Sequence, residues 1–264
     1  MSTMDFRSQV YSPIQNMALW LVAWLYNHVS YDDLLEALDE LSGSQQSATG
    51  EPFIDLLARI RQYHQPFSQN TYTVPVSFAL GGIGNPIGIA PSHPAYELVK
   101  QGTGALFFSG ADLDYATLIP VETDGSTIWH WHESQGIAPA PSYLLPGQAD
   151  KMLSDATRDA VKSIEQNTTA AKIHADSHAL KASQPRLLVG SLNDFYEAPG
   201  IPPMTPVRSE KLIARANNVA AIVEALVSRI GDHSFDHILF PLGQHIRQAR
   251  MSAVNYAFLE WART

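Results

Sequence analysis

The chain has 264 residues, 45% of them hydrophobic and 16% charged, which is enough to bury a sizeable core in one large domain or two small ones. A formal net charge of −9 argues against nucleic acid as a partner, because phosphate binding needs clustered Lys and Arg, and against an anionic membrane surface. The absence of cysteine excludes disulfides, thiolate metal ligands and a cysteine nucleophile.

The N-terminal sequence lacks a secretory pattern, because no basic segment leads into an apolar one. The apolar run at 17–26 has about half the length of a bilayer span, which needs ~20 residues. We therefore expect a cytoplasmic protein without membrane segments.

The first predicted helix, over 13–28, is apolar on every side. It carries Trp20 and Trp24 one turn apart. A helix of this kind must be covered by the rest of the fold or by a partner. The two tryptophans are therefore candidate interface residues.

Two shorter helices are predicted next. Ser30 is a candidate N-cap and Gly43 a stop for a helix with acids in its first turn and a stripe of leucines. The polar, turn-rich stretch 42–50 is expected to be a loop. A further helix is expected over 52–63.

After residue 66 the hydrophobic pattern changes from helical to alternating. Pro75 indicates that the first strand lies at a sheet edge, and Asp124-Gly125 is typical of a two-residue hairpin turn. A short helix is expected over 92–102. The predicted strands lie near 71–80, 104–109, 116–123, 126–133 and 186–190.

The last third is predicted to be helical, with a long helix over 148–166. Apolar residues over 212–230 recur at alternating spacings of four and three, as in a heptad seam. The final helix, over 244–262, has a narrow face of small residues and should pack against the seam as an antiparallel hairpin. Strands in the middle and helices at both ends predict an α+β fold. We expect a helical segment, 1–66, packed on a main domain, 67–264, or a single domain overall.

The stretch "STIWHWHESQ" alternates tryptophan and histidine. The predicted hairpin pairs Ile119 with His130 and Thr117 with His132. Both histidines then lie on one face of the sheet, and the tryptophans between them lie on the opposite face, which is the better core.

Two imidazoles on one strand face, about 7 Å apart, can ligate a metal ion, although any amphipathic strand can show the same pattern. Glu133 or Asp236 would act as the base on a metal-bound water. The candidate ligands are His130 and His132, with a third from His174, His178, His233 or His237, which form two pairs at a spacing of four residues.

The glycine-rich stretch "LGGIGNPIGIAP" has neither the dinucleotide fingerprint nor the P-loop spacing, and prolines precede the next helix. No nicotinamide or flavin dinucleotide is therefore expected. Backbone N–H groups at Gly82, Gly84 and Asn85 form a candidate anion loop. Ser109, at a strand end, is a candidate nucleophile that lacks the usual G-x-S-x-G motif.

No catalytic motif is complete, so the sequence favours a protein that acts through contacts with a protein partner or with copies of itself. The N-terminal helices and the Pro-rich stretch 197–207 would supply these contacts. One alternative is a hydrolase that uses a divalent metal at His130 and His132. Another is a small-ligand binding protein in which Trp129 or Trp131 stacks on the ligand.

Overall fold

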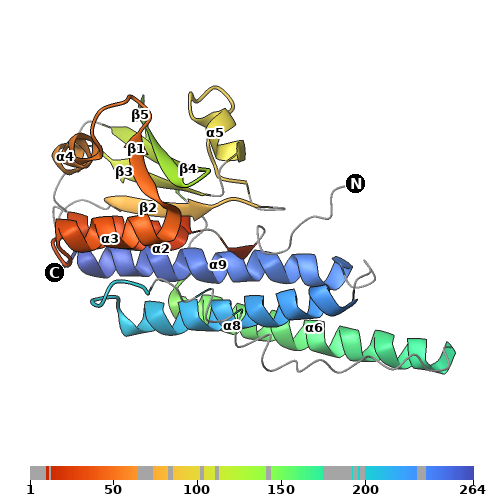
Figure 1. Cartoon of the computed structure of the whole chain (residues 1–264). Helices are drawn as coiled ribbons and strands as arrows, with labels where there is room; N and C mark the ends of the chain where they lie inside the picture. Colours follow the sequence, from red (N-terminus) through yellow and green to blue (C-terminus); the bar gives the residue numbers. More distant parts are fainter. Residues whose placement is uncertain are drawn as a thin grey trace.

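The computed structural model describes residues 10–11, 13–64, 74–82, 86–101, 104–110, 113–140, 144–174, 192, 196, 200–230 and 236–264. N-terminal helices, a mixed five-stranded sheet and long C-terminal helices follow one another along the chain, which confirms the predicted α+β fold. Figure 1 shows the sheet above a layer of long helices.

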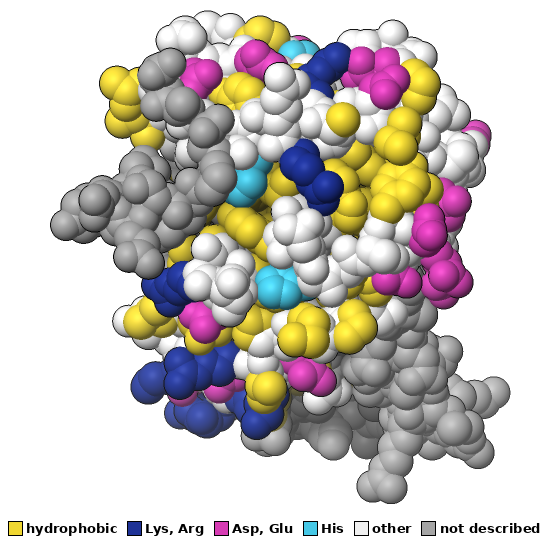
Figure 2. Space-filling view, turned by 90° about the vertical axis from the view of Figure 1, so that its left-hand side faces the viewer, with side chains coloured by type: hydrophobic (Ala, Val, Ile, Leu, Met, Phe, Trp, Pro, Cys, Tyr) yellow, Lys and Arg dark blue, Asp and Glu magenta, His cyan; other side chains and the backbone are white. Residues whose placement is uncertain are grey.

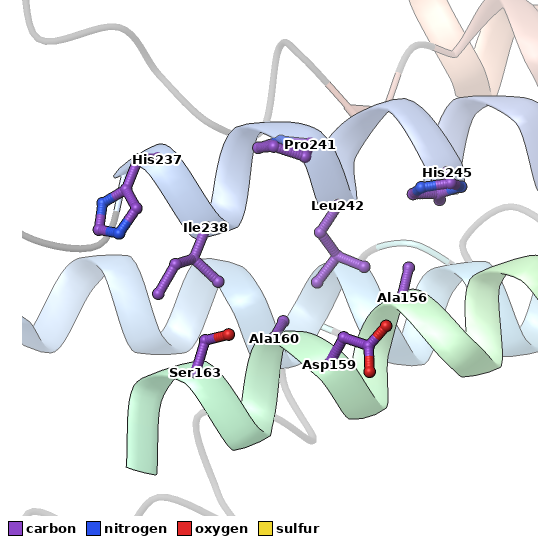
Figure 3. A pocket seen from close by; sticks show the side chains of 9 residues that line it. All are labelled: Ala156, Asp159, Ala160, Ser163, His237, Ile238, Pro241, Leu242 and His245. Carbon is purple, nitrogen blue, oxygen red and sulfur yellow. The ribbon is translucent and has the colours of Figure 1, made fainter. Parts of the chain in front are cut away.

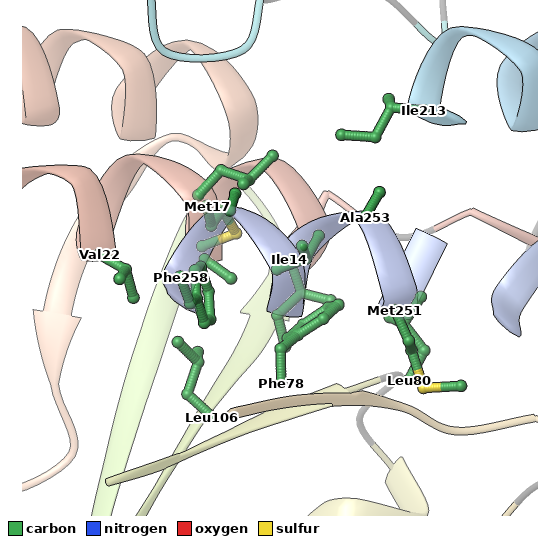
Figure 4. Packing of buried hydrophobic residues seen from close by; sticks show 14 of the residues in the cluster. Ile14, Met17, Val22, Phe78, Leu80, Leu106, Ile213, Met251, Ala253 and Phe258 are labelled. Carbon is green, nitrogen blue, oxygen red and sulfur yellow. The ribbon is translucent and has the colours of Figure 1, made fainter. Parts of the chain in front are cut away.

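Helix α2 (Ile14–Leu25) is buried on all sides, as its apolar sequence predicts: all of its residues except Trp20 are buried. The cover comes from this chain, since α2 contacts α3 (Tyr31–Ser42), α9 (Asp236–Trp261) and the sheet. Figure 4 shows the resulting core, in which Met17 of α2 lies near Phe258 of α9.

The two further N-terminal helices begin and end close to where the sequence predicts. The Ser30 side chain accepts a hydrogen bond from the Asp33 N–H (3.1 Å), and the Asp33 carboxylate accepts one from the Ser30 N–H (3.2 Å). This capping box satisfies two backbone donors at the start of α3. Gly43 ends the helix with φ 74°, a left-handed conformation that favours glycine. Helix α4 spans Phe53–Tyr63.

The strands are β1 (Ser44–Ser47), β2 (Val76–Leu80), β3 (Gly104–Ser109), β4 (Asp114–Thr123) and β5 (Ser126–Gln135), in the spatial order β1-β5-β4-β3-β2. β2 lies at an edge, as Pro75 indicated. The prediction of a loop throughout 42–50 was wrong, because β1 pairs parallel with β5. Its polar sequence carries no strand pattern, and the Gln45 side chain, bonded to the Trp129 indole N–H (2.7 Å), helps to hold it there.

The predicted hairpin register is confirmed. Ile119 lies opposite His130 and Thr117 opposite His132, and the turn glycine, Gly125, has φ 76°. Both hairpin strands extend two residues further from the turn than predicted.

Three long helices form the lower layer of Figure 1: α6 (Pro146–His174), α8 (Val207–Ile230) and α9. The seam helix α8 packs on α9, as predicted, and α6 contacts both. Helix α9 begins eight residues before the predicted start at 244 and carries Pro241 within it. The prediction stopped short because proline is unfavourable inside a helix, but α9 tolerates it where it packs on α6.

The sheet has an apolar core on each face. The larger core lies between the sheet and the long helices and includes Phe78 and Trp129. The smaller core includes Phe107 and Ile119, and it packs against Ile87, Ile89 and the short helix α5 (Tyr96–Gln101). Figure 1 shows α5 on the side of the sheet away from the long helices. The segment from Ile87 to α5 therefore covers this second face, and Ala138, from the stretch after β5, also packs against this core.

An asparagine of α9 closes the outer edge of β2. The Asn255 side chain accepts a hydrogen bond from the Phe78 N–H (2.8 Å) and donates one to the Phe78 C=O (2.9 Å). It thereby replaces the neighbouring strand that an edge residue lacks.

The predicted strand at 186–190 lies outside the described residues, and the predicted boundary at 66/67 stays a prediction. No described helix combines the length and the hydropathy that a membrane-spanning segment requires.

Candidate ligand site

The tryptophan face of β5 is a core face, as expected. Trp129 is buried, its ring lies 5.8 Å from that of Phe53, and its indole N–H is bonded to Gln45. The Trp131 ring packs edge-on against Tyr63 at 5.3 Å. A ligand that stacked on either indole at this face would have to displace Phe53, Gln45 or Tyr63.

The opposite face brings a third histidine to the predicted pair. The rings of His130 and His132 are parallel, with centroids 6.4 Å apart, and His93 lies edge-on to His132 at 6.5 Å. Burial lowers the pKa of all three imidazoles, and the neighbouring His132 adds to this effect at His93 and His130. His93 had no sequence signal, since it stands alone before a short helix.

His93 is fully engaged in hydrogen bonds. Its Nδ1 accepts from the Ala95 N–H (3.0 Å), so its Nε2 carries the proton and donates to the Ser134 hydroxyl (2.8 Å). A Ser–His catalytic pair requires the reverse arrangement, with Nε2 accepting the serine proton. The Ser134–His93 pair is therefore a structural contact, and His93 has no nitrogen free to ligate a metal.

The proposed base of the metal site lies elsewhere. Glu133 follows the alternation of β5 onto the tryptophan face, where its carboxylate accepts a hydrogen bond from the Trp131 indole (2.9 Å). It cannot reach a water held between His130 and His132. Within the described residues, no three His, Asp or Glu side chains are grouped closely enough to hold a metal ion.

The other predicted histidines divide between described and undescribed parts of the chain. The side chains of His174 and Asp236, and all of His178 and His233, lie outside what the structure describes. His237 lies on α9, exposed, at a cavity of 530 Å³ between α6 and α9. Figure 3 shows His237 and His245 on α9, with Asp159 and Ser163 on the facing helix.

The structure describes part of the two remaining predicted sites. The Ser109 hydroxyl donates to the Val74 C=O (2.8 Å), which anchors the end of β3. At Gly82 a Cβ would collide with the guanidinium of Arg247, a buried cation whose pKa burial lowers. Gly84 and Asn85 lie outside the described residues.

A cationic cavity lies between the N-terminal halves of α6 and α8. It measures 570 Å³, within the usual range of small-molecule sites. Its cations are Arg208, Lys211 and Arg215, at spacings of three and four residues, which place them on one face of α8. That spacing is visible in the sequence, although none of the motifs predicted from it contains these three residues.

The charge of this cavity, called here the α6–α8 pocket, is unbalanced. Its single carboxylate, Asp150, is paired with Arg215 at 3.0 Å, and Ser154 accepts a second bond from the same guanidinium. Among the described residues, Arg208 and Lys211 have no ion-pair partner. Figure 2 shows Lys and Arg side chains gathered in the lower part of one face, at the level of α6 and α8.

The remaining walls of the pocket are of two kinds. The first turn of α6, at Pro146 and Gly147, carries no acidic residue and adds the partial positive charge of a helix N-terminus. The apolar wall consists of Leu145, Leu212 and Tyr256. The pocket thus offers positive charge on one side and an apolar or aromatic surface on the other.

Comparison with known proteins gives two matches to family models. The model of the N-terminal domain of Rv1486c-like protein matches residues 15–143, and the model of the C-terminal domain of Rv1486c-like protein matches residues 147–251. No curated protein and no solved structure matches the chain. Because both domain models match in order and together span most of the sequence, the chain belongs to the Rv1486c-like proteins.

Proposed function

We propose that this protein binds a small organic anion, such as a phosphate ester, in the α6–α8 pocket. The observation that carries the proposal is the excess of positive charge in that pocket, in a chain whose formal net charge is −9. Asp150 offsets the charge of Arg215, whereas Arg208 and Lys211 lie on the same helix face without a carboxylate partner among the described residues, and their mutual repulsion would be relieved by a bound anion.

The shape of the pocket favours an organic anion over a simple ion. An inorganic phosphate would fill a small part of 570 Å³. The anionic group would lie against Arg208 and Lys211, since Arg is well suited to bidentate bonds with phosphate and Lys offers a point charge. The rest of the ligand would cover Leu145, Leu212 and the ring of Tyr256.

Isothermal titration calorimetry with AMP, adenosine and inorganic phosphate tests the proposal. We expect AMP to bind and its affinity to fall as salt rises, while adenosine binds at least tenfold more weakly. In Arg208→Ala/Lys211→Ala the affinity for AMP should fall at least tenfold, because each lost charge-assisted bond contributes about 1.5–3 kcal/mol.

The matched control is Lys162→Ala/Arg263→Ala, which removes the same charge from exposed positions outside the pocket. This control should bind AMP as the unchanged protein does. Equal losses in both double variants would mean that net charge alone attracts the anion. The same titration is extended to diphosphate and to an aromatic carboxylate, and a failure of these two ligands and of AMP to bind the unchanged protein would exclude the proposed function.

A role in protein contacts is the second proposal, and a separate feature supports it. Leu113 and Ile137 are 74% and 82% exposed, and they lie beside each other at one end of the β4–β5 hairpin, where the Gly136 N–H donates to the Leu113 C=O (2.7 Å). Leu113 also has φ 52°, a conformation uncommon for leucine. The two neighbouring side chains offer an apolar surface that a partner or a second copy could bury.

Sedimentation velocity over a hundredfold concentration range tests this second role. Self-association should appear in the unchanged protein and disappear in Leu113→Ser/Ile137→Ser. The same experiment with Trp20→Gln tests the predicted N-terminal interface; its indole N–H already donates to the Gly200 C=O (3.0 Å). A monomer at all concentrations would exclude self-association at either surface.

A further inference from the structure

An ion pair connects the two helices that form the α6–α8 pocket. The Asp150 carboxylate, on α6, lies 3.0 Å from Nε of Arg215, on α8, and the Ser154 hydroxyl accepts a hydrogen bond from Nη1 of the same guanidinium (3.1 Å). Asp150 and Ser154 are four residues apart, so they lie on one face of α6. Together they hold the Arg215 side chain against α6.

The three cations of the pocket are consequently not equivalent. Arg208 and Lys211 have no ion-pair partner among the described residues, whereas the charge of Arg215 is offset by Asp150. Three cations and one carboxylate leave the pocket with a net side-chain charge of +2. A phosphate monoester has a second pKa of about 6 and carries a charge of about −2 at pH 7.5. One such group therefore balances the charge of the pocket.

A second phosphate on the same ligand would come close to Asp150. Arg215 lies one helical turn beyond Lys211, about 6 Å along α8. A diphosphate that extended from Lys211 towards Arg215 would be attracted by the guanidinium and repelled by the carboxylate bonded to it. These two effects largely cancel, because the two opposite charges lie at nearly the same distance from the second phosphate.

We propose that Asp150 is a specificity-determining residue of the α6–α8 pocket and selects phosphate monoesters over diphosphates. The inference rests on the proposed function, because it names the class of phosphate ligand that the same pocket takes. Asp150 acts through Arg215, whose charge it offsets and whose guanidinium it holds at α6. Without this carboxylate the net charge of the pocket would be +3, and Arg215 would attract a second phosphate.

The exposure of the ion pair determines the size of the expected effect. The side chains of Arg215 and Asp150 are 47% and 41% exposed, so solvent screens their charges. In water, the interaction of two unit charges about 4 Å apart corresponds to a change of about fivefold in affinity. Removal of the carboxylate should therefore raise the affinity for a diphosphate about fivefold relative to that for a monophosphate.

Isothermal titration calorimetry with AMP and ADP, without divalent cations, tests the proposal. AMP should bind the unchanged protein at least as tightly as ADP does. In Asp150→Asn the ratio of the ADP affinity to the AMP affinity should rise about fivefold. In Asp150→Asn/Arg215→Gln this ratio should return to the value of the unchanged protein, because the second phosphate has lost its cation. A purely structural role of Asp150 would weaken the binding of both nucleotides together and leave the ratio constant.

Asp155→Asn is the matched control. Asp155 also lies on α6, is 42% exposed and pairs with Lys151 at 2.8 Å, but it does not line the pocket. Its removal subtracts the same charge and should leave the ratio of affinities unchanged. If Asp150→Asn does not fold, Asp150→Ser takes its place with the same expectation.

Four outcomes would overturn the proposal. ADP that binds the unchanged protein more tightly than AMP would do so, as would a constant ratio in the Asp150 variant or an equal rise in Asp155→Asn. In these three cases the nucleotides still bind, so the proposed function stands. If neither nucleotide binds the unchanged protein, selection among phosphates is excluded, and the titration with an aromatic carboxylate then decides whether the pocket takes an organic anion of another class.

Discussion

Substitution of Asn255 by leucine is expected to open the outer edge of the sheet. Leucine is similar in size to asparagine and keeps the packing of α9 against β2, but it cannot bond the Phe78 N–H and C=O. Phe78 is fully buried, so water cannot replace the lost partner. The variant therefore separates the contribution of the side chain's hydrogen bonds from that of packing.

The magnitude follows from the two groups left unpaired. A buried backbone donor or acceptor without a partner costs about 1–3 kcal/mol, so Asn255→Leu should lower the free energy of unfolding by about 2–6 kcal/mol. For a chain of this size each kcal/mol lowers Tm by about 2–4 °C. Urea denaturation should show the loss, and amide exchange should show reduced protection at Phe78.

Two comparisons make this prediction refutable. Asn218→Leu, at an exposed position on α8, should change stability by less than about 0.5 kcal/mol. In the unchanged protein the Asn255 amide nitrogen donates to the carbonyls of Phe78 and Met251. In Asn255→Asp a carboxyl oxygen takes the place of that nitrogen. The aspartic acid should therefore stay protonated in the fold, and its loss of stability should grow as the pH rises above about 4. If Asn255→Leu is as stable as the unchanged protein, the side chain does not close the edge.

Three further changes test local features. Ser30→Ala removes the capping box of α3 and should cost about 1 kcal/mol in urea denaturation; no change would mean that the cap is not needed. Gly43→Ala would place a Cβ against the Gly125 carbonyl, at a residue with φ 74°. Gly50 has a similar φ of 77° but open space around it, so Gly43→Ala should lower Tm more than Gly50→Ala does. Equal Tm losses would contradict this reasoning. Burial lowers the pKa of His64 to about 4, so the free energy of unfolding should fall by on the order of 2 kcal/mol between pH 6.5 and 4.5. His64→Phe should remove most of this pH dependence, which urea denaturation of the variant and of the unchanged protein would show.

The sequence predicted most of the fold because its local signals agree with the tertiary structure. The Asp124-Gly125 turn determined the register of β4 and β5, residue by residue, since a two-residue hairpin allows one pairing. β1 could not be predicted from its sequence, because its four polar residues form a strand by pairing with β5 and through the side-chain bonds of Gln45. Its strand structure therefore depends on a partner about 80 residues away.

Candidate sites were harder to predict for a related reason. His130 and His132 were located correctly because strand alternation is local, whereas His93 joins them only through the fold. The cations of the α6–α8 pocket share a helix face that the sequence does show, yet the apolar wall comes partly from Tyr256 of α9. Spacing along one element can identify one side of a site, and the facing side depends on tertiary packing.

The polar residues of α9 show how much of this structure lies beyond hydrophobic patterning. The sequence presents α9 as a helix with a narrow face of small residues, but its buried side also carries Asn255 and Arg250. Arg250 is completely buried, donates to Gln15 of α2 (2.9 Å) and Asn217 of α8 (2.7 Å), and lies over the ring of Tyr196 at 5.6 Å. Burial lowers its pKa to about 10, which is still far above neutrality, so the residue remains a cation. Both hydrogen bonds come from Nη1, and Nε and Nη2 have no hydrogen-bond partner among the described residues, so the rings of Tyr11 and Tyr196 supply further stabilisation of the buried charge. Through these contacts α9 makes polar bonds to both α2 and α8 within the apolar core, and they connect residues matched by the two family models.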